Sequence, residues 1–248
     1  MKSYGISDKG KIRRDNQDAF SIIDSEERGC VIVALCDGMG GQKAGGVASE
    51  IAKRAFTEYV EAKLRSKAVK NPDLHSIIKN GCAEANEVVY YYSRFDEKYS
   101  GMGTTLVGGI IKKDGSGLIL NVGDSRAYVL SKKKKTIRQV TVDHSYVEEL
   151  VRKGLITREQ ARTHPRKNVI TRALGTEKTV QSDVFEIKLN KGELLLLCSD
   201  GLTNYVTDEE ILDEYLVDSA PEAFCRGLLS MSYFGGGGDN ITIVAVEK

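Results

Sequence analysis

The sequence predicts an α+β protein in which antiparallel β-sheets are covered by helices on their outer faces. Many short apolar runs have the composition of strands, and they follow one another too closely for the helical crossovers that parallel strands require. Two longer stretches instead have the periodicity of amphipathic helices. Sheets and helices of this kind bury their apolar faces against each other in layers. Strands are expected near residues 18–24, 30–36, 104–111, 117–122, 126–131, 136–142, 183–189, 193–198 and 241–246.

The two long helices are expected from Ala44 to about Lys63 and from Leu74 to Tyr92, where apolar residues recur at helical spacing. The segment Asn71-Pro72-Asp73 is the predicted cap of the second helix. Later helices are predicted from capping boxes, in which a hydroxyl side chain and a nearby Glu or Gln accept hydrogen bonds from each other's free backbone N–H groups. The candidate boxes are Thr157 with Gln160, Thr207 with Glu210, and Ser219 with Glu222.

Length and composition indicate one domain over residues 1–248. The chain is long enough for a substantial core and has no Pro/Ser-rich linker or shift in composition. It carries 36 Lys and Arg against 35 Asp and Glu, a net charge of +1, and the two signs are interleaved. This balance argues against a nucleic-acid or membrane-surface binder. We also expect the protein to be a monomer.

The N-terminal segment lacks the apolar core of a signal peptide, and no stretch approaches the about 18 apolar residues needed to cross a bilayer. We therefore expect a soluble, cytoplasmic protein. The five cysteines are odd in number, lack metal-ligand spacing and fall mostly within apolar runs. Buried, reduced thiols are the preferred interpretation over a catalytic or disulfide role.

Five aspartates, Asp18, Asp37, Asp124, Asp200 and Asp239, are the strongest functional signal. Four of them adjoin apolar runs: CVIVALC before Asp37, LILNVG before Asp124, ELLLLCS before Asp200, and ITIVAV after Asp239. Such runs are typical of buried strands, so these carboxylates would lie together at the rim of a sheet core and repel each other. Mg²⁺ or Mn²⁺, which prefer oxygen ligands, would relieve that repulsion. Asp-Gly and Gly-Asp pairs are also ordinary turn chemistry, however, and a turn role stays open for each aspartate alone.

The sequence motifs around these aspartates favour the metal site. Six blocks follow one another in order, and together they resemble the metal-dependent Ser/Thr protein phosphatases of type 2C in their short bacterial form. The resemblance covers essentially the whole chain, at the length of a bare catalytic domain. The blocks are Gly10-Lys11-Ile12-Arg13-Arg14-Asp15-Asn16-Gln17-Asp18, Asp37-Gly38-Met39-Gly40-Gly41, Gly101-Met102-Gly103-Thr104-Thr105, Val122-Gly123-Asp124-Ser125-Arg126, Ser199-Asp200-Gly201-Leu202 and Asp239-Asn240-Ile241-Thr242.

The resemblance implies a four-layer αββα fold, a central sandwich of two antiparallel sheets flanked by helix pairs, with metals at one end. It also implies hydrolysis of phosphoserine and phosphothreonine in proteins by a water activated at two Mg²⁺ or Mn²⁺ ions. The expected partners are phosphorylated proteins, including a bacterial Ser/Thr kinase that the enzyme opposes.

The resemblance assigns roles residue by residue. Asp37 would bridge the two ions, with the carbonyl of Gly38 as a further ligand and with Asp200 and Asp239 completing the site. Asp18 would act mainly through coordinated water. Asp124 would hold a third, weaker ion together with Asp200. Arg13 would clamp the substrate phosphate, because a planar guanidinium makes paired charge-assisted bonds to phosphate oxygens.

One position departs from the family. Many eukaryotic members have a histidine where this chain has Met39, and methionine cannot protonate a leaving group. Metal-bound water is the simplest substitute. Among the three histidines, only His164 stays a weak candidate for this role, because it lies in the stretch from about Ser145 to Gly175 that matches the family's mobile flap. The basic residues of this flap either attract acidic phosphoprotein segments or belong to a solvated helical hairpin.

Two rival functions stay open beside the phosphatase. One is a pseudoenzyme of the same fold that acts as a binding module; it would be expected to have lost metal carboxylates, whereas all five are present. The other is a regulator that dephosphorylates one small partner within a sigma-factor switch, although relatives of that kind commonly carry sensor domains that this chain lacks.

Overall fold

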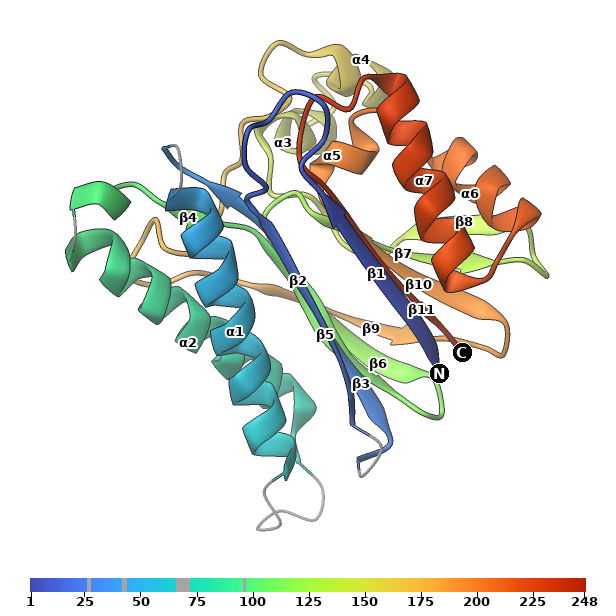
Figure 1. Cartoon of the computed structure of the whole chain (residues 1–248), viewed down its shortest axis with the longest axis horizontal. Helices are drawn as coiled ribbons and strands as arrows, with labels where there is room; N and C mark the ends of the chain where they lie inside the picture. Colours follow the sequence, from blue (N-terminus) through green and yellow to red (C-terminus); the bar gives the residue numbers. More distant parts are fainter. Residues whose placement is uncertain (26–27, 42–43, 66–71, 96) are drawn as a thin grey trace.

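Two antiparallel sheets face each other and form the centre of the molecule (Figure 1). The computed structural model describes residues 1–25, 28–41, 44–65, 72–95 and 97–248. Helices α1 (Ala44–Arg65) and α2 (Leu74–Phe95) cover one sheet, and helices α6 (Asp208–Val217) and α7 (Pro221–Gly235) cover the other. The predicted α+β class and the four-layer arrangement implied by the resemblance are both confirmed.

Each sheet contains strands from distant parts of the chain. One sheet has the order β1 (Lys2–Asp8), β11 (Ile241–Glu247), β10 (Glu193–Cys198), β7 (Arg126–Ser131), β8 (Thr136–Gln139). The other has the order β2 (Asp18–Ser25), β3 (Cys30–Met39), β5 (Leu106–Lys112), β6 (Ser116–Val122), β9 (Asp183–Lys188), and β4 (Gly103–Thr104) also pairs with β3. The short helices are η2 (Glu97–Tyr99), α3 (Tyr146–Arg152), α4 (Arg158–Thr163) and α5 (Asp200–Thr203).

The central strands are apolar throughout because both of their faces are buried. In β3, Val31, Val33 and Leu35 pack into the core between the two sheets, whereas Ile32 and Ala34 pack against α1 and α2. The side chains of β10 likewise alternate between the core that separates the two sheets and the core beneath α6 and α7. Three cores therefore hold four layers together, which explains why these runs have no polar face for solvent.

Three strand predictions differ from the structure. The first strand, β1, was missed because its sequence KSYGISD has few apolar residues. It is an edge strand whose one partner among the described strands is β11, from Lys2 opposite Glu247 to Asp8 opposite Ile241. The expected strand at 104–111 is divided, since Thr105 separates β4 from β5. The expected strand at 136–142 is shorter, because β8 ends at Gln139.

The helix predictions are correct except at one cap. The boxes Thr157/Gln160 and Thr207/Glu210 both form. The box Ser219/Glu222 is wrong: α7 begins at Pro221, a residue suited to the first turn, and its N-cap, Ala220, makes no side-chain bond. At the start of α2, Asn71 lies outside the described residues, while the Asp73 carboxylate accepts hydrogen bonds from the backbone N–H groups of His75 and Ser76.

The five cysteines are all buried and unpaired, as predicted. Within the described ranges, no helix is long and apolar enough to cross a membrane.

Candidate metal centre

The five predicted aspartates come together at one end of the sandwich, and both sheets contribute. Asp18 begins β2 and is paired directly with Asp37 of β3 in the antiparallel register. Asp124 follows β6, Asp200 follows β10 as the first residue of α5, and Asp239 precedes β11. Because these strand ends meet at the same rim, the spacing along the sequence becomes a cluster in space.

A cavity of about 230 Å³ opens at this rim. Asp18 is not on its wall; its Oδ2 accepts a hydrogen bond of 2.8 Å from the Ser199 hydroxyl. The lining thus contains every residue predicted for the phosphate and the ions except Asp18. The predicted site residues on the wall are Arg13, Asp37, Gly38, Asp124, Asp200 and Asp239, and Met39, Thr105, Asn168, Ile170 and Asn240 also line it.

Burial raises the pKa of Asp18, Asp37, Asp124 and Asp200 above the usual range of an aspartate. Loss of contact with water is the largest cause at each, and the charges of neighbouring aspartates raise the pKa further. The pKa rises to about 7 at Asp18 and to about 6 at Asp200. The protein groups around this cluster therefore do not supply enough positive charge to keep all of its carboxyls readily ionised at neutral pH.

The donor set fits divalent cations. Oδ1 of Asp18 and Oδ1 of Asp200 are buried and have no hydrogen-bond partner among the described residues. Buried carboxylate oxygens are normally paired, and oxygen-only donors suit Mg²⁺ and Mn²⁺. In the described residues, no three His, Cys, Asp or Glu side chains already surround a point as bound ligands would. Arg13 pairs with Asp239, with 2.9 Å between Nη2 and Oδ2.

Hydroxyl and amide side chains that the sequence analysis left without a role hold the aspartates in place. The Thr105 hydroxyl accepts a hydrogen bond from the backbone N–H of Asp37 and shares another, of 2.7 Å, with the Ser125 hydroxyl. It therefore joins the strand of Asp37 to the turn of Asp124. The Asn204 amide donates to Oδ2 of Asp200 at 2.9 Å. Thr105 lies within a quoted block, but nothing in its spacing distinguishes a support from a turn residue.

The loop that carries Arg13 is fastened to the centre by Asn240. Its Oδ1 accepts from the backbone N–H of Gln17, and its Nδ2 donates to the carbonyl oxygens of Lys9 and Asp15. Gly10, with φ of +73°, lies so close to the Asp239 carbonyl that a Cβ would be 2.1 Å from that oxygen. Arg13 itself is half exposed, so its guanidinium faces solvent above the aspartates.

Gly38 is required by close packing of the backbone. A Cβ at this position would lie 2.1 Å from the carbonyl oxygen of Gly45, at the start of α1, and 2.6 Å from that of Gln17. Any side chain would push α1 away from the cavity. The glycine thus brings a main-chain carbonyl to the wall beside Asp37.

Neither Met39 nor the histidines supply an obvious proton donor. Met39 lines the cavity with a thioether, which carries no acidic proton. His75 lies at the surface beside Glu186, and buried His144 bonds to the Gly123 backbone and to Asp183. The ring of His164 instead lies 5.9 Å from the ring of Tyr146, within the flap.

Comparison with known proteins gives this arrangement a family. Residues 12–224 match the family model of protein phosphatase 2C. The chain belongs to the protein phosphatase 2C family. It is 37% identical over 242 residues to the serine/threonine phosphatase stp of Listeria welshimeri, an alignment that covers 98% of this chain and 94% of the relative.

Solved structures of family members have the same fold. The serine/threonine phosphatase Stp1 from Staphylococcus aureus matches with a TM-score of 0.90 at 36% identity, over 99% of this chain and 94% of that one. The catalytic domain of the phosphatase PstP, solved in complex with two manganese ions, matches with a TM-score of 0.82 at 30% identity, over 99% and 97% of the two chains. The resemblance stated from sequence and the enzyme class, a metal-dependent protein serine/threonine phosphatase, are confirmed.

The raised pKa values predict how the metal-free protein responds to pH. A carboxyl with a higher pKa in the folded chain stabilises the fold below its unfolded pKa, near 4, and this contribution is lost as pH rises through the folded pKa. The contribution of these carboxyls to the free energy of unfolding should therefore fall between pH 4 and 7, on the order of 3 kcal/mol for Asp18. Urea unfolding of chelator-treated protein across this range measures it.

Asp18→Asn should flatten this pH dependence, and added Mn²⁺ should restore stability at high pH. Asp114→Asn is the matched control, because the Asp114 carboxylate is exposed and hydrogen bonds from Ser116 lower its pKa to about 2, outside the range. An Asp18→Asn protein whose stability follows the same pH profile as that of wild type between pH 4 and 7 would contradict the assignment.

Proposed function

We propose that this chain hydrolyses phosphoserine and phosphothreonine in proteins at two divalent ions held by Asp37, Gly38, Asp200 and Asp239. The observation that carries the proposal is the convergence of buried aspartates from both sheets on one small cavity, with unpartnered oxygens on Asp18 and Asp200. The names of the relatives and the manganese ions in the PstP structure support the same reading.

In this proposal the aspartates hold the ions and Arg13 binds the phosphate. When bound, the ions supply an acidified water for attack and positive charge that holds the phosphoryl group. The charges of all four other aspartates raise the pKa of Asp37, so it lies near each of them, which suits a bridging ligand. The Asp18 carboxylate, held by Ser199, suits a role through water. Arg13 orients the phosphate, and its hydrogen bond to Asp239 keeps the guanidinium at the mouth of the centre.

Asp124 holds a third, weaker ion with Asp200 in this proposal. It is buried and lies on the wall shared with Asp200, whose charge helps raise its pKa. An ion held there would supply an acidic water, which could serve in place of the histidine that Met39 replaces as the proton source for the leaving alkoxide. His164 is the weaker candidate, because its ring lies against Tyr146 and its Nδ1 accepts from the Arg166 backbone.

A pseudoenzyme is the less favoured reading, since the aspartates are not only retained but brought together. For the same protein we infer a cytoplasmic location, a monomer, and phosphoprotein substrates that include a Ser/Thr kinase. A partner within a sigma-factor switch is the narrower alternative for the substrate. Either Mg²⁺ or Mn²⁺ suits the ligands.

Activity should require added metal and discriminate among phosphopeptides. Chelator-treated protein should be inactive on a phosphothreonine peptide, regain activity with Mn²⁺ or Mg²⁺, and act far more slowly on the matching phosphotyrosine peptide. Carboxylates and waters hold these ions more loosely than thiolates or imidazoles do, so chelation removes them readily. Phosphate release measures this. Full turnover without metal would rule out the proposed centre.

Arg13→Ala should mainly raise KM for phosphopeptides, by roughly tenfold or more, because charge-assisted hydrogen bonds to the ground-state phosphate are lost. Steady-state kinetics and metal titration should be run together, with Arg14→Ala as the exposed neighbouring control. Weakened metal binding at unchanged KM would make Arg13 an architectural partner of Asp239 instead of a phosphate clamp.

Asp124→Ala should keep two bound ions and lose turnover on phosphopeptides by about a hundredfold, the usual size of an acid–base contribution. Calorimetric titration with Mn²⁺ counts the ions, and kinetics measures the loss. Asp114→Ala is the matched control, because Asp114 is a true turn aspartate whose Oδ1 accepts from the Ser116 backbone. Wild-type turnover would leave Asp124 as a turn residue, and loss of all ions would place it in the primary site.

A further inference from the structure

The flap segment (residues 145–175) contains two helices that have no buried core. Neither α3 nor α4 includes a buried residue. The helices are tied mainly to each other, by the Arg166 guanidinium 3.8 Å from the centre of the Tyr146 ring and by an ion pair between Arg158 and Glu148. Because neither helix packs an apolar face against the sandwich, the position of the flap depends on the residues at its two ends.

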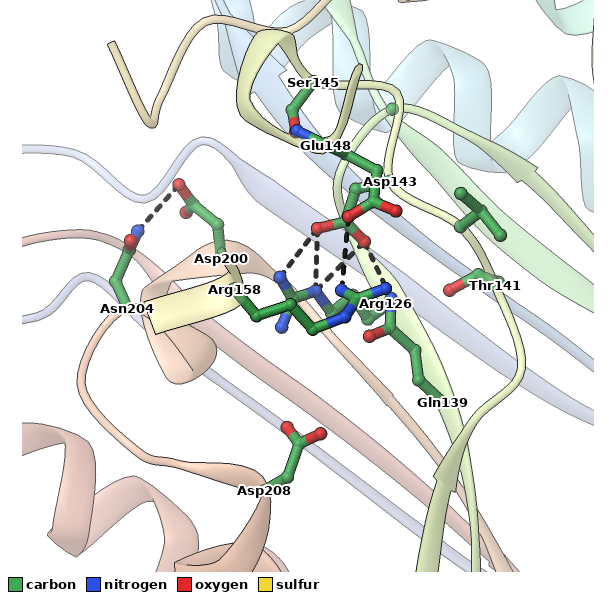
Figure 2. A network of polar contacts seen from close by, with 12 residues as sticks. Arg126, Gln139, Thr141, Asp143, Ser145, Glu148, Arg158, Asp200, Asn204 and Asp208 are labelled. Carbon is green, nitrogen blue, oxygen red and sulfur yellow. Dashed lines mark hydrogen bonds and ion pairs between the residues drawn. The ribbon is translucent and has the colours of Figure 1, made fainter. Parts of the chain in front are cut away.

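The first end is fixed by an ion pair between Arg126 and Asp143 (Figure 2). Arg126 begins β7, and Asp143 precedes the flap by two residues. Nε of Arg126 donates to both carboxylate oxygens, at 3.0 and 2.9 Å, and Nη2 donates to Oδ2 at 2.7 Å. Gln139 adds a bond of 2.9 Å to Oδ1. The Asp143 side chain is only 8% exposed, so little water competes for these bonds.

The same arginine reaches helix α6. Its Nη1 donates to the Tyr128 hydroxyl at 3.1 Å, and that hydroxyl donates to Oδ1 of Asp208 at 3.1 Å. The arginine therefore sets the flap end, strand β7 and the start of α6 at fixed distances from one another.

The turn that carries Asp124 is joined to the flap end at a second point. The Gly123 N–H donates to Nδ1 of His144 at 3.0 Å, and the His144 N–H donates to the Gly123 carbonyl at 2.9 Å. Asp124 thus lies between Gly123, bound to His144, and Arg126, bound to Asp143. The other end of the flap is tied by Leu174 to Thr104 of β4, and the Thr171 N–H also donates to the His144 carbonyl at 2.8 Å.

A second cavity, of about 470 Å³, lies between the flap and the α5–α6 segment. Arg126, Gln139 and Asp143 line it, and it shares Asp124 and Asp200 with the metal-centre cavity. A peptide whose phosphorylated residue enters the centre would have this cavity beside it. The width of the cavity depends on where the flap end is held.

We propose that Arg126 and Asp143 are positioning residues, which fix the flap against the Asp124 turn so that it binds the peptide flanking the phosphorylated residue; this rests on the proposed function. Arg126 lines the second cavity and is not on the wall of the metal-centre cavity. Its planar fork determines both the distance and the angle of the bond to Asp143, which a lysine ammonium does not.

Arg126→Lys tests the proposal, because it keeps the charge and loses the fork. The KM for a phosphothreonine peptide should rise about tenfold, while kcat and KM for para-nitrophenyl phosphate, which has no flanking peptide, stay near wild type. In metal-free protein, amide exchange over residues 146–170 should accelerate about tenfold relative to that of β10 and β11. Arg226→Met is the control, because it removes an exposed pair with Glu222 on α7.

A second variant guards against unfolding. Arg126→Met with Asp143→Leu replaces the pair with apolar groups, leaves no unpaired charge and should show the same two effects. Unchanged amide exchange of the flap in both variants would overturn the proposal. An equal loss of kcat on both substrates would also overturn it, because Arg126 would then act only by positioning Asp124. If wild type is inactive on both substrates, the proposed function fails, while the exchange comparison, which needs neither metal nor substrate, still decides whether Arg126 holds the flap.

Discussion

The mutual repulsion of buried aspartates is the constraint on which the rest of this structure depends. Asp18, Asp37, Asp124 and Asp200 have all left water, and each makes the next harder to ionise. A protein that needed only stability would gain by replacing them. Two stacked sheets with continuous apolar cores give the rigidity that keeps such a rim from relaxing. The cores are therefore the support of the metal centre as well as the source of stability.

Much of the centre was visible in the sequence because strand ends are local signals. Asp37, Asp124 and Asp200 each follow an apolar run, and the runs are apolar throughout because helices and the opposite sheet cover both faces. The resemblance supplied what those signals lacked, which was the roles of Arg13 and Gly38. Those roles stay predictions, whereas the family and the fold are confirmed.

Features that depend on tertiary contacts were not predictable from the sequence. Strand β1 has too few apolar residues to be recognised, and it forms because β11 offers an edge. The pair Arg126–Asp143 joins residues 17 apart, across a hairpin whose geometry the sequence does not specify. The start of α7 is the opposite case, because two local signals competed there. The capping box predicted at Ser219 does not form, and the preference of proline for the first turn of a helix sets the start at Pro221.

The pairing of β1 with β11 has a consequence for synthesis. In the part of the chain that the structure describes, residues 2–8 pair with no strand other than residues 241–247, and the loop after β1 is fastened by Asn240. On a ribosome, the first strand must therefore wait unpaired until almost all of the chain described here has been translated. Arg13 and Asp239 meet only then, so a nascent chain has no assembled centre. The closing of this sheet therefore brings together the last two parts of the centre.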